Sequence, residues 1–128
     1  MERQEFEQIV RQSWLRIPPR FRRQVENLAI VVEQEPSRAL LRSSGVRAGD
    51  ALLGLYQGVP LGQRGSGYQL ALPDKITLFQ GPIERAARGE EEIPRIVYDT
   101  LWHEVGHYFG MSEPQIRAAE RRRGALPR

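Results

Sequence analysis

The chain has 128 residues, a length that suits one domain with its own hydrophobic core, so we expect residues 1–128 to form a single domain. Its apolar runs fall short of the roughly 18 residues that span a membrane, and the charged N-terminus lacks a signal peptide's apolar core, which predicts a cytoplasmic protein without a membrane partner. Although the net charge is +3 and the pI about 9.8, the basic residues are scattered rather than gathered in a stripe, which argues against nucleic acid as a partner.

Two helices and a strand are predicted at the N-terminus. Apolar residues recur at spacings of three and four over residues 3–16, which indicates an amphipathic helix. Pro18 and Pro19 end that helix and suit the first turn of a second, short helix at about 19–26. Residues 28–33, LAIVVE, are rich in β-branched side chains and predict a buried strand.

The middle of the chain predicts strands separated by loops. Residues 37–43 fit a turn of helix, and a second strand is expected at about 51–57. The Gly- and Pro-rich stretch 58–74 has no clear period and indicates a surface loop. A third strand is expected at 75–79, and Gly81-Pro82 opens a short helix, IERAAR, at 83–88.

The C-terminal part predicts two further helices. A central helix is expected at about 93–109 and should stop at Gly110. Ser112 and Gln115 have the spacing of a capping box for a last helix at 113–122. The order of helices, then strands, then helices favours an α+β fold, in which a small mixed sheet of three to four strands carries helices mainly on one face.

The chain's only two histidines lie on the predicted central helix. His103 and His107 are four residues apart, which places them on one helical face, and Glu104 follows the first directly. Two imidazoles so placed can bind one zinc ion, and the glutamate can act as general base toward a zinc-activated water. Because the chain has no cysteine, any further ligand must be a carboxylate. Two surface histidines on an amphipathic helix are the alternative, which this combination of features disfavours.

The third ligand can be sought among the carboxylates near this helix. Glu113 comes six residues after His107, and a sharp turn at Gly110 could bring its carboxylate back to the metal. An acid in the first turn of a helix is also favoured by the helix dipole alone. Glu120, seven residues further on, is the second candidate. Asp99, one turn before the first histidine, is expected to orient an imidazole rather than to bind the metal.

The segment HEVGHYFGMSE resembles the HExxHxxGxx(H/D) motif of the metzincin metallopeptidases. His103, Glu104, His107 and Gly110 match that motif, and Glu113 stands where the metzincins have His or Asp, which gives an HExxHxxGxxE variant. No later methionine turn follows the motif.

The whole plan of the chain is more similar to the small bacterial zincin-like metallopeptidases, the minimal zincins, a group without an assigned function. The similarity covers roughly residues 3–120 and rests on an N-terminal helix pair, the segments LAIVVE, GLYQGVPL and LPDKITLFQGPIER, and an HExxH helix near the C-terminus. It implies a zincin-like α+β fold, a zinc cofactor and hydrolysis of an unidentified peptide or protein substrate. Zincins hold their substrate along an edge strand of the sheet, and residues 75–79 are the strand expected to do so here.

Two alternatives remain open at this point. A metal-dependent endoribonuclease of the HGxLHxxGxxH type uses a similar helix, but that family has glycine where this chain has Glu104. A non-catalytic zincin-fold protein with a vestigial metal site would suit the short chain, which leaves little to wall a deep cleft. The oligomeric state does not follow from the sequence.

Overall fold

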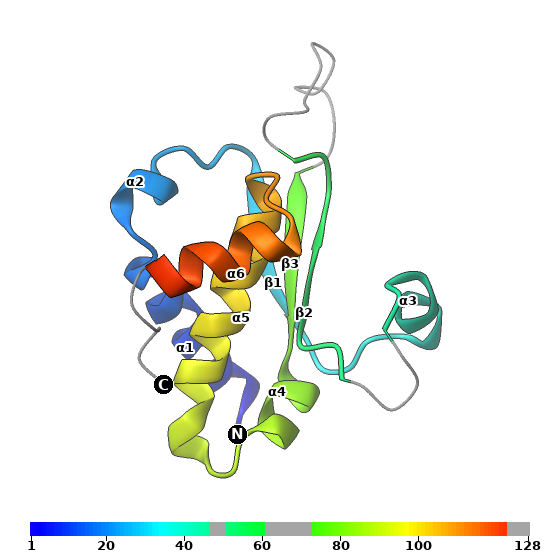
Figure 1. Ribbon diagram of the computed structural model, residues 1–128. Coiled ribbons are helices and arrows are strands. Elements are labelled where there is room, and N and C mark those ends of the chain that lie inside the picture. The colour runs from blue at the N-terminus through cyan, green and yellow to red at the C-terminus, as the bar shows by residue number, and fades with distance from the viewer. Residues whose placement is uncertain (47–50, 61–72, 123–128) are drawn as a thin grey trace.

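A computed structural model describes residues 1–46, 51–60 and 73–122 of the chain. Helices and strands follow one another as α1 (Arg3–Arg16), α2 (Pro19–Arg22), β1 (Leu28–Glu33), α3 (Arg38–Ser43), β2 (Gly54–Gln57), β3 (Asp74–Phe79), α4 (Gln80–Ala86), a 3₁₀ turn (Glu90–Glu92), α5 (Ile93–Tyr108) and α6 (Glu113–Arg122) (Figure 1). This is the α+β order expected from the sequence. None of the described helices has the length and apolar character needed to cross a bilayer.

The three described strands form one mixed sheet in the order β1-β3-β2. β3 pairs in parallel with β1, with Leu28 opposite Asp74, and antiparallel with β2, with Gly54 opposite Leu78. The prediction that residues 75–79 form an edge strand is therefore wrong, because both backbone edges of β3 are already paired. Among the described strands, β2 and β1 are the outer ones.

Most predicted elements are found close to their expected limits. α2 is shorter than predicted and ends at Arg22. The chain turns again at Asn27, which has a φ of 57° that asparagine tolerates better than most residues. β2 begins at Gly54 rather than at residue 51, and α4 begins at Gln80, with its proline inside the first turn. Most of the loop predicted at 58–74 lies outside the described residues.

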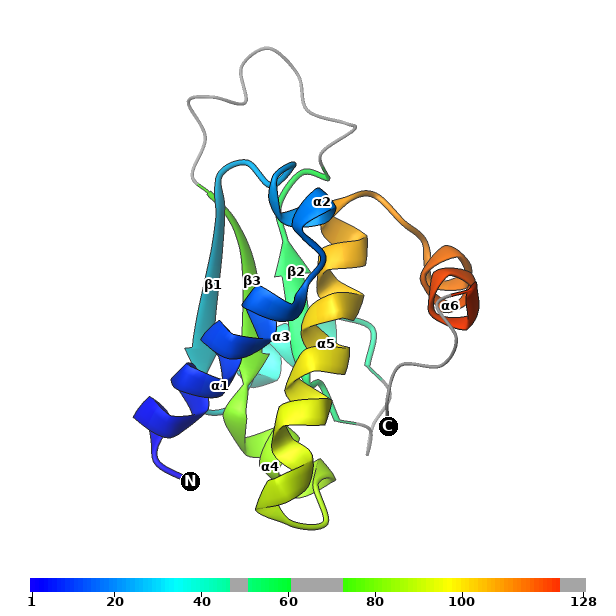
Figure 2. The ribbon, with the colours of Figure 1, turned by 90° about the vertical axis from the view of Figure 1, so that its left-hand side faces the viewer.

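One face of the sheet is covered by α1 and α5 (Figure 2), and α3 lies on the opposite side. α5 is the central element, since it contacts α1, α4, β2 and β3. A stripe of its apolar side chains at spacings of four is fully buried, and burial of each stabilises the fold by roughly 1.5–3 kcal/mol. The stripe consists of Ile93, Val97, Leu101 and Val105. The core therefore fixes the rotation of α5 about its axis and with it the direction in which the histidines point.

Candidate metal centre

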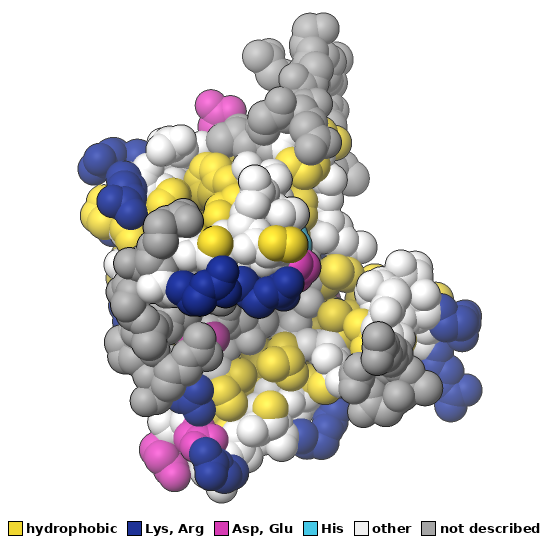
Figure 3. Space-filling view, in the orientation of Figure 1, with side chains coloured by type: hydrophobic (Ala, Val, Ile, Leu, Met, Phe, Trp, Pro, Cys, Tyr) yellow, Lys and Arg dark blue, Asp and Glu magenta, His cyan; other side chains and the backbone are white. Residues whose placement is uncertain are grey.

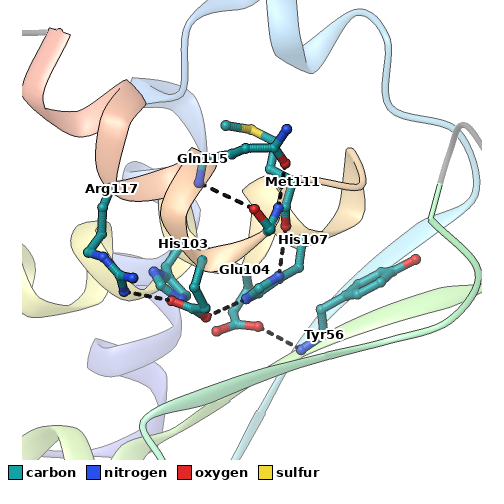
Figure 4. Close-up of polar contacts among 9 residues, drawn as sticks. Tyr56, His103, Glu104, His107, Met111, Gln115 and Arg117 are labelled. Carbon is teal, nitrogen blue, oxygen red and sulfur yellow. Dashed lines mark hydrogen bonds and ion pairs between the residues drawn. The ribbon is translucent and has the colours of Figure 1, made fainter.

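Both histidines lie on the face of α5 that is turned away from α1 and toward β2 and α6 (Figure 4). Their rings are 5.1 Å apart between centroids, and each side chain keeps about 30% of its surface accessible. His103 and His107 are thus held by a buried helix yet open to the surface, as the four-residue spacing predicts.

The turn after α5 is built around Gly110. Its φ of 85° lies in the left-handed region, which glycine adopts without strain, and its N–H donates to the carbonyl of His107. α6 then starts with the predicted capping box: the Ser112 amide donates to Gln115 Oε1 at 2.7 Å, and the Gln115 amide donates to Ser112 Oγ at 3.4 Å. The turn and cap together bring the first residue of α6, Glu113, back over the end of α5.

The carboxylate of Glu113 meets both imidazoles. Its Oε1 lies 2.7 Å from His103 Nε2 and 2.9 Å from His107 Nε2, while its Oε2 lies 3.7 Å from Arg117 Nη1. Partial burial would raise the pKa of Glu113, but the hydrogen bonds with the two histidines outweigh that effect and hold the pKa below its usual value. The three residues offer one ligand atom each, all within 4.8 Å of one another.

The proton on His107 can be placed from its second contact. Its Nδ1 lies 3.2 Å from the carbonyl oxygen of Met111, which can only accept, so Nδ1 carries a proton. In the neutral imidazole, Nε2 then presents a lone pair toward a carboxylate, which also presents lone pairs. Two facing acceptors require a proton or a metal ion between them.

The separations also suit a metal ion. Ligand atoms about 2.0–2.2 Å from a tetrahedral zinc ion lie roughly 3.3–3.6 Å from one another. The observed 2.7 and 2.9 Å would have to widen by less than about 1 Å, which rotation of the Glu113 side chain can supply. Two imidazoles and one carboxylate are ligands that zinc accepts, so the residues present fit that ion.

Glu104 lies between the two histidines in sequence and is only 8% exposed. Its Oε1 accepts a hydrogen bond from the backbone N–H of Tyr56 in β2 at 2.9 Å. Burial raises the pKa of Glu104, while charge on the two neighbouring histidines and the Tyr56 N–H act in the opposite direction. The close approach of β2 to α5 depends on Gly54, where a Cβ would lie 2.7 Å from Thr100 Cγ2.

A groove of about 540 Å³ lies over these residues. β2 forms one wall, and the end of α5 and the start of α6 form the other; its lining includes Leu55, Tyr56, Pro60, Gly110 and Met111 beside the two histidines and their glutamates. Figure 3 shows only a sliver of histidine on the face that carries α6, beside an acidic side chain and a row of basic ones. A larger cavity of about 720 Å³ lies between α1 and β1, away from the histidines.

The residues predicted for the site are placed as follows. His103, His107, Glu104 and Glu113 come together at the groove. Asp99 Oδ2 lies 3.9 Å from Arg95 Nη1. The expected contact of Asp99 with an imidazole stays a prediction. The side chain of Glu120 lies outside the described residues, so this second candidate also remains a prediction.

Two contributors to the site were missed from the sequence. The carbonyl of Met111 and the amide of Tyr56 both act through the backbone. Backbone groups are present at every residue, so no residue-type pattern reveals which of them will reach a site.

Comparison with known proteins agrees with this geometry. A protein family described as zincin-like metallopeptidase matches residues 25–123. Among solved structures, the fold is similar to that of a conserved hypothetical protein from "Thermo thermophilus", with a TM-score of 0.57 and 21% identity over 94% of this chain and 99% of that one. No curated protein matches the chain significantly.

Proposed function

The chain belongs to the zincin-like metallopeptidase family, and we propose that it is a zinc-dependent peptidase whose ion is held by His103, His107 and Glu113. The family implies a divalent metal, and the described residues contain one cluster of three side chains that could hold it. The proposal is carried by one observation: the Nε2 atoms of both histidines converge on a single carboxylate oxygen. When bound, zinc would activate a water molecule and polarise the peptide carbonyl.

Glu104 is the proposed general base. Its carboxylate would accept a proton as water attacks the carbonyl carbon and would return it to the leaving amine as the C–N bond breaks. Burial raises the pKa of this group, which brings its proton affinity closer to that needed for proton transfer near neutral pH. A merely structural pair of histidines would not require an acid buried beside them.

The proposed substrate is an extended segment of polypeptide. β2 is an outer strand among those described, and Gly54, Leu55 and Tyr56 line the groove beside the histidines. An outer strand can pair with an extended chain through backbone hydrogen bonds, which presents a peptide bond without demanding a particular side chain.

The test is hydrolysis of a peptide mixture by the zinc-loaded protein, with products identified by mass spectrometry. Glu104→Gln should keep its zinc and lose at least about 100-fold in hydrolysis, the contribution typical of general acid–base catalysis. Glu7→Gln on α1, where the carboxylate pairs with Arg3 and does not line the groove, is the matched control and should retain full activity. Hydrolysis that is equal in wild type and Glu104→Gln would rule the peptidase out.

A further inference from the structure

A buried carboxylate lies behind the groove. Asp74, the first residue of β3, is only 2% exposed. Its Oδ2 accepts a hydrogen bond from the Tyr56 hydroxyl at 2.5 Å, and its Oδ1 accepts one from the Val59 amide at 3.4 Å. The carboxylate thus holds a strand residue of β2 and the turn that follows it.

The chain after β2 is shaped around this carboxylate. A Cβ atom at Gly58 would lie 2.2 Å from Asp74 Cγ and 2.4 Å from its Oδ1, so only glycine fits there. The Asp74 amide in turn donates to the Asn27 carbonyl at 2.9 Å, which fixes the start of β3. Asp74 therefore ties the end of β2 to the body of the sheet.

Tyr56 is held at its other end by α5. The Phe79 amide donates to the Leu53 carbonyl, so in this antiparallel pair the backbone groups of Tyr56 point away from β3. The Tyr56 N–H then reaches Glu104 Oε1 at 2.9 Å. The Tyr56 ring also contacts the ring of Tyr108 edge-on, with 5.9 Å between centroids.

We propose that Asp74 and Tyr56 are positioning residues for Glu104. The carboxylate of Asp74 fixes the Tyr56 hydroxyl, and the strand residue so fixed presents its amide to one oxygen of Glu104. The other carboxylate oxygen of Glu104 is then left for proton transfer. The positioning role rests on the proposed function. The tie, by which we mean the chain of contacts from Asp74 through Tyr56 to Glu104, can be measured without any hydrolysis.

The physical reason is that Tyr56 is held at two points, at its hydroxyl by Asp74 and at its backbone N–H by Glu104. A carboxylate buried like that of Glu104 needs a donor, and an outer strand supplies a fixed one only if the strand itself is held. Asp74 binds the side chain of Tyr56, whereas the backbone N–H of Tyr56 binds Glu104 of α5. Nothing in this arrangement requires Asp74 to touch the substrate.

Amide hydrogen exchange of the ¹⁵N-labelled, zinc-loaded protein tests the tie. Tyr56→Phe should speed exchange of the residue 56 amide by roughly two- to tenfold, the range expected when a hydrogen bond of ordinary net strength is lost. Glu104→Ala gives the reference rate for full loss of the acceptor. The exchange rate of the Leu55 amide, which points toward β3, should stay unchanged. Tyr98→Phe is the control because it removes a hydroxyl from a buried tyrosine that does not line the groove.

An unchanged rate at residue 56, or an equal rise at residues 55 and 56, would overturn the proposal, because the latter is general fraying of β2. Asp74→Ala, which removes the acceptor of the Tyr56 hydroxyl, provides a second variant should Tyr56→Phe fail to fold, and it should give the same selective rise. In a hydrolysis assay, Tyr56→Phe should have a lower kcat than Tyr98→Phe, whereas KM and zinc content should be the same in both variants. An unchanged kcat would also overturn the proposal. Absence of hydrolysis in the wild type would contradict the proposed function alone, since exchange reports the tie independently.

Discussion

Ile116 of α6 packs directly against Gly106 of α5. A Cβ atom at Gly106 would lie 2.8 Å from Ile116 Cγ1 and 2.9 Å from its Cδ1, so α6 can pack this closely against α5 only because Gly106 has no side chain. Ile116 is 1% exposed and lies one turn after Glu113. The carboxylate that meets the histidines is therefore positioned by an apolar contact on a neighbouring face of α5.

This contact predicts that Gly106→Ala weakens zinc binding. The new methyl group would displace Ile116 and move Glu113 with it, which should lower zinc affinity by about tenfold, as loss of supporting contacts typically does. Alanine is also the better helix former by about 1 kcal/mol, so thermal stability should not fall in parallel. Competition with a chromophoric chelator measures the affinity. The double variant Gly106→Ala/Ile116→Ala should recover part of the loss, and an affinity unchanged in the single variant would contradict this account.

The identity of the third ligand can be tested by two matched substitutions on α6. Glu113→Ala should lower zinc affinity by at least about tenfold, because it removes one of the three ligands expected at such a site. Glu120→Ala removes the same side chain two turns later and should leave the affinity at the wild-type value. Isothermal titration would separate the two, and the reverse pattern would assign the ligand to Glu120.

Stability of the zinc-free protein should depend on pH through Glu104. Burial raises its folded-state pKa above the usual 4.5, so the folded state binds this proton more tightly than the unfolded state does. The resulting stability is fully present below about pH 4.5 and is lost as the pH rises through the folded-state pKa. Glu104→Gln lacks this loss, so its Tm advantage over the wild type should grow as pH rises from that value.

Thermal unfolding in the presence of a chelator provides the measurement. Glu35→Gln is a control of opposite sign, because the hydrogen bond from Arg85 lowers the pKa of Glu35. Its stabilising contribution is present above the unfolded-state pKa and disappears as the pH falls through the folded-state value. If the Tm difference between Glu104→Gln and wild type shrinks with rising pH, burial does not destabilise the charged form of Glu104.

The core can be tested with two leucines of contrasting exposure. Leu101 is fully buried on α5, two residues before His103, whereas Leu15 on α1 is 64% exposed. Leu101→Ala should cost about 2–5 kcal/mol in unfolding free energy, and Leu15→Ala less than about 0.5 kcal/mol. Chemical denaturation would measure both. Comparable costs would mean that α5 is not the central buried helix.

The local parts of the fold were predictable because their signals are local. The four-residue spacing of His103 and His107, the stop at Gly110 and the cap at Ser112 each act within one or two helical turns. Together they indicated that Glu113 would return to the histidines, and it does. Short-range physical rules were enough for these features.

Strand order was not predictable in the same way. The alternation of residues 75–79 indicated a strand but contained nothing about which strands would pair with it. β3 is central because both β1 and β2 pair with it. β1 begins 46 residues before β3, and β2 begins 20 residues before it. Such pairings are decided by tertiary packing, as is the arrival of the Tyr56 amide at Glu104.

The most direct measurement is a crystal structure of the protein grown with zinc, with the ion located by anomalous scattering. The account predicts one zinc ion in the groove, with the Nε2 atoms of His103 and His107 and a carboxylate oxygen of Glu113 each at about 2.0–2.2 Å. Glu104 should lie outside that ligand set and keep its hydrogen bond from β2. Zinc bound elsewhere, or bound to the histidines without Glu113, would contradict the central claim.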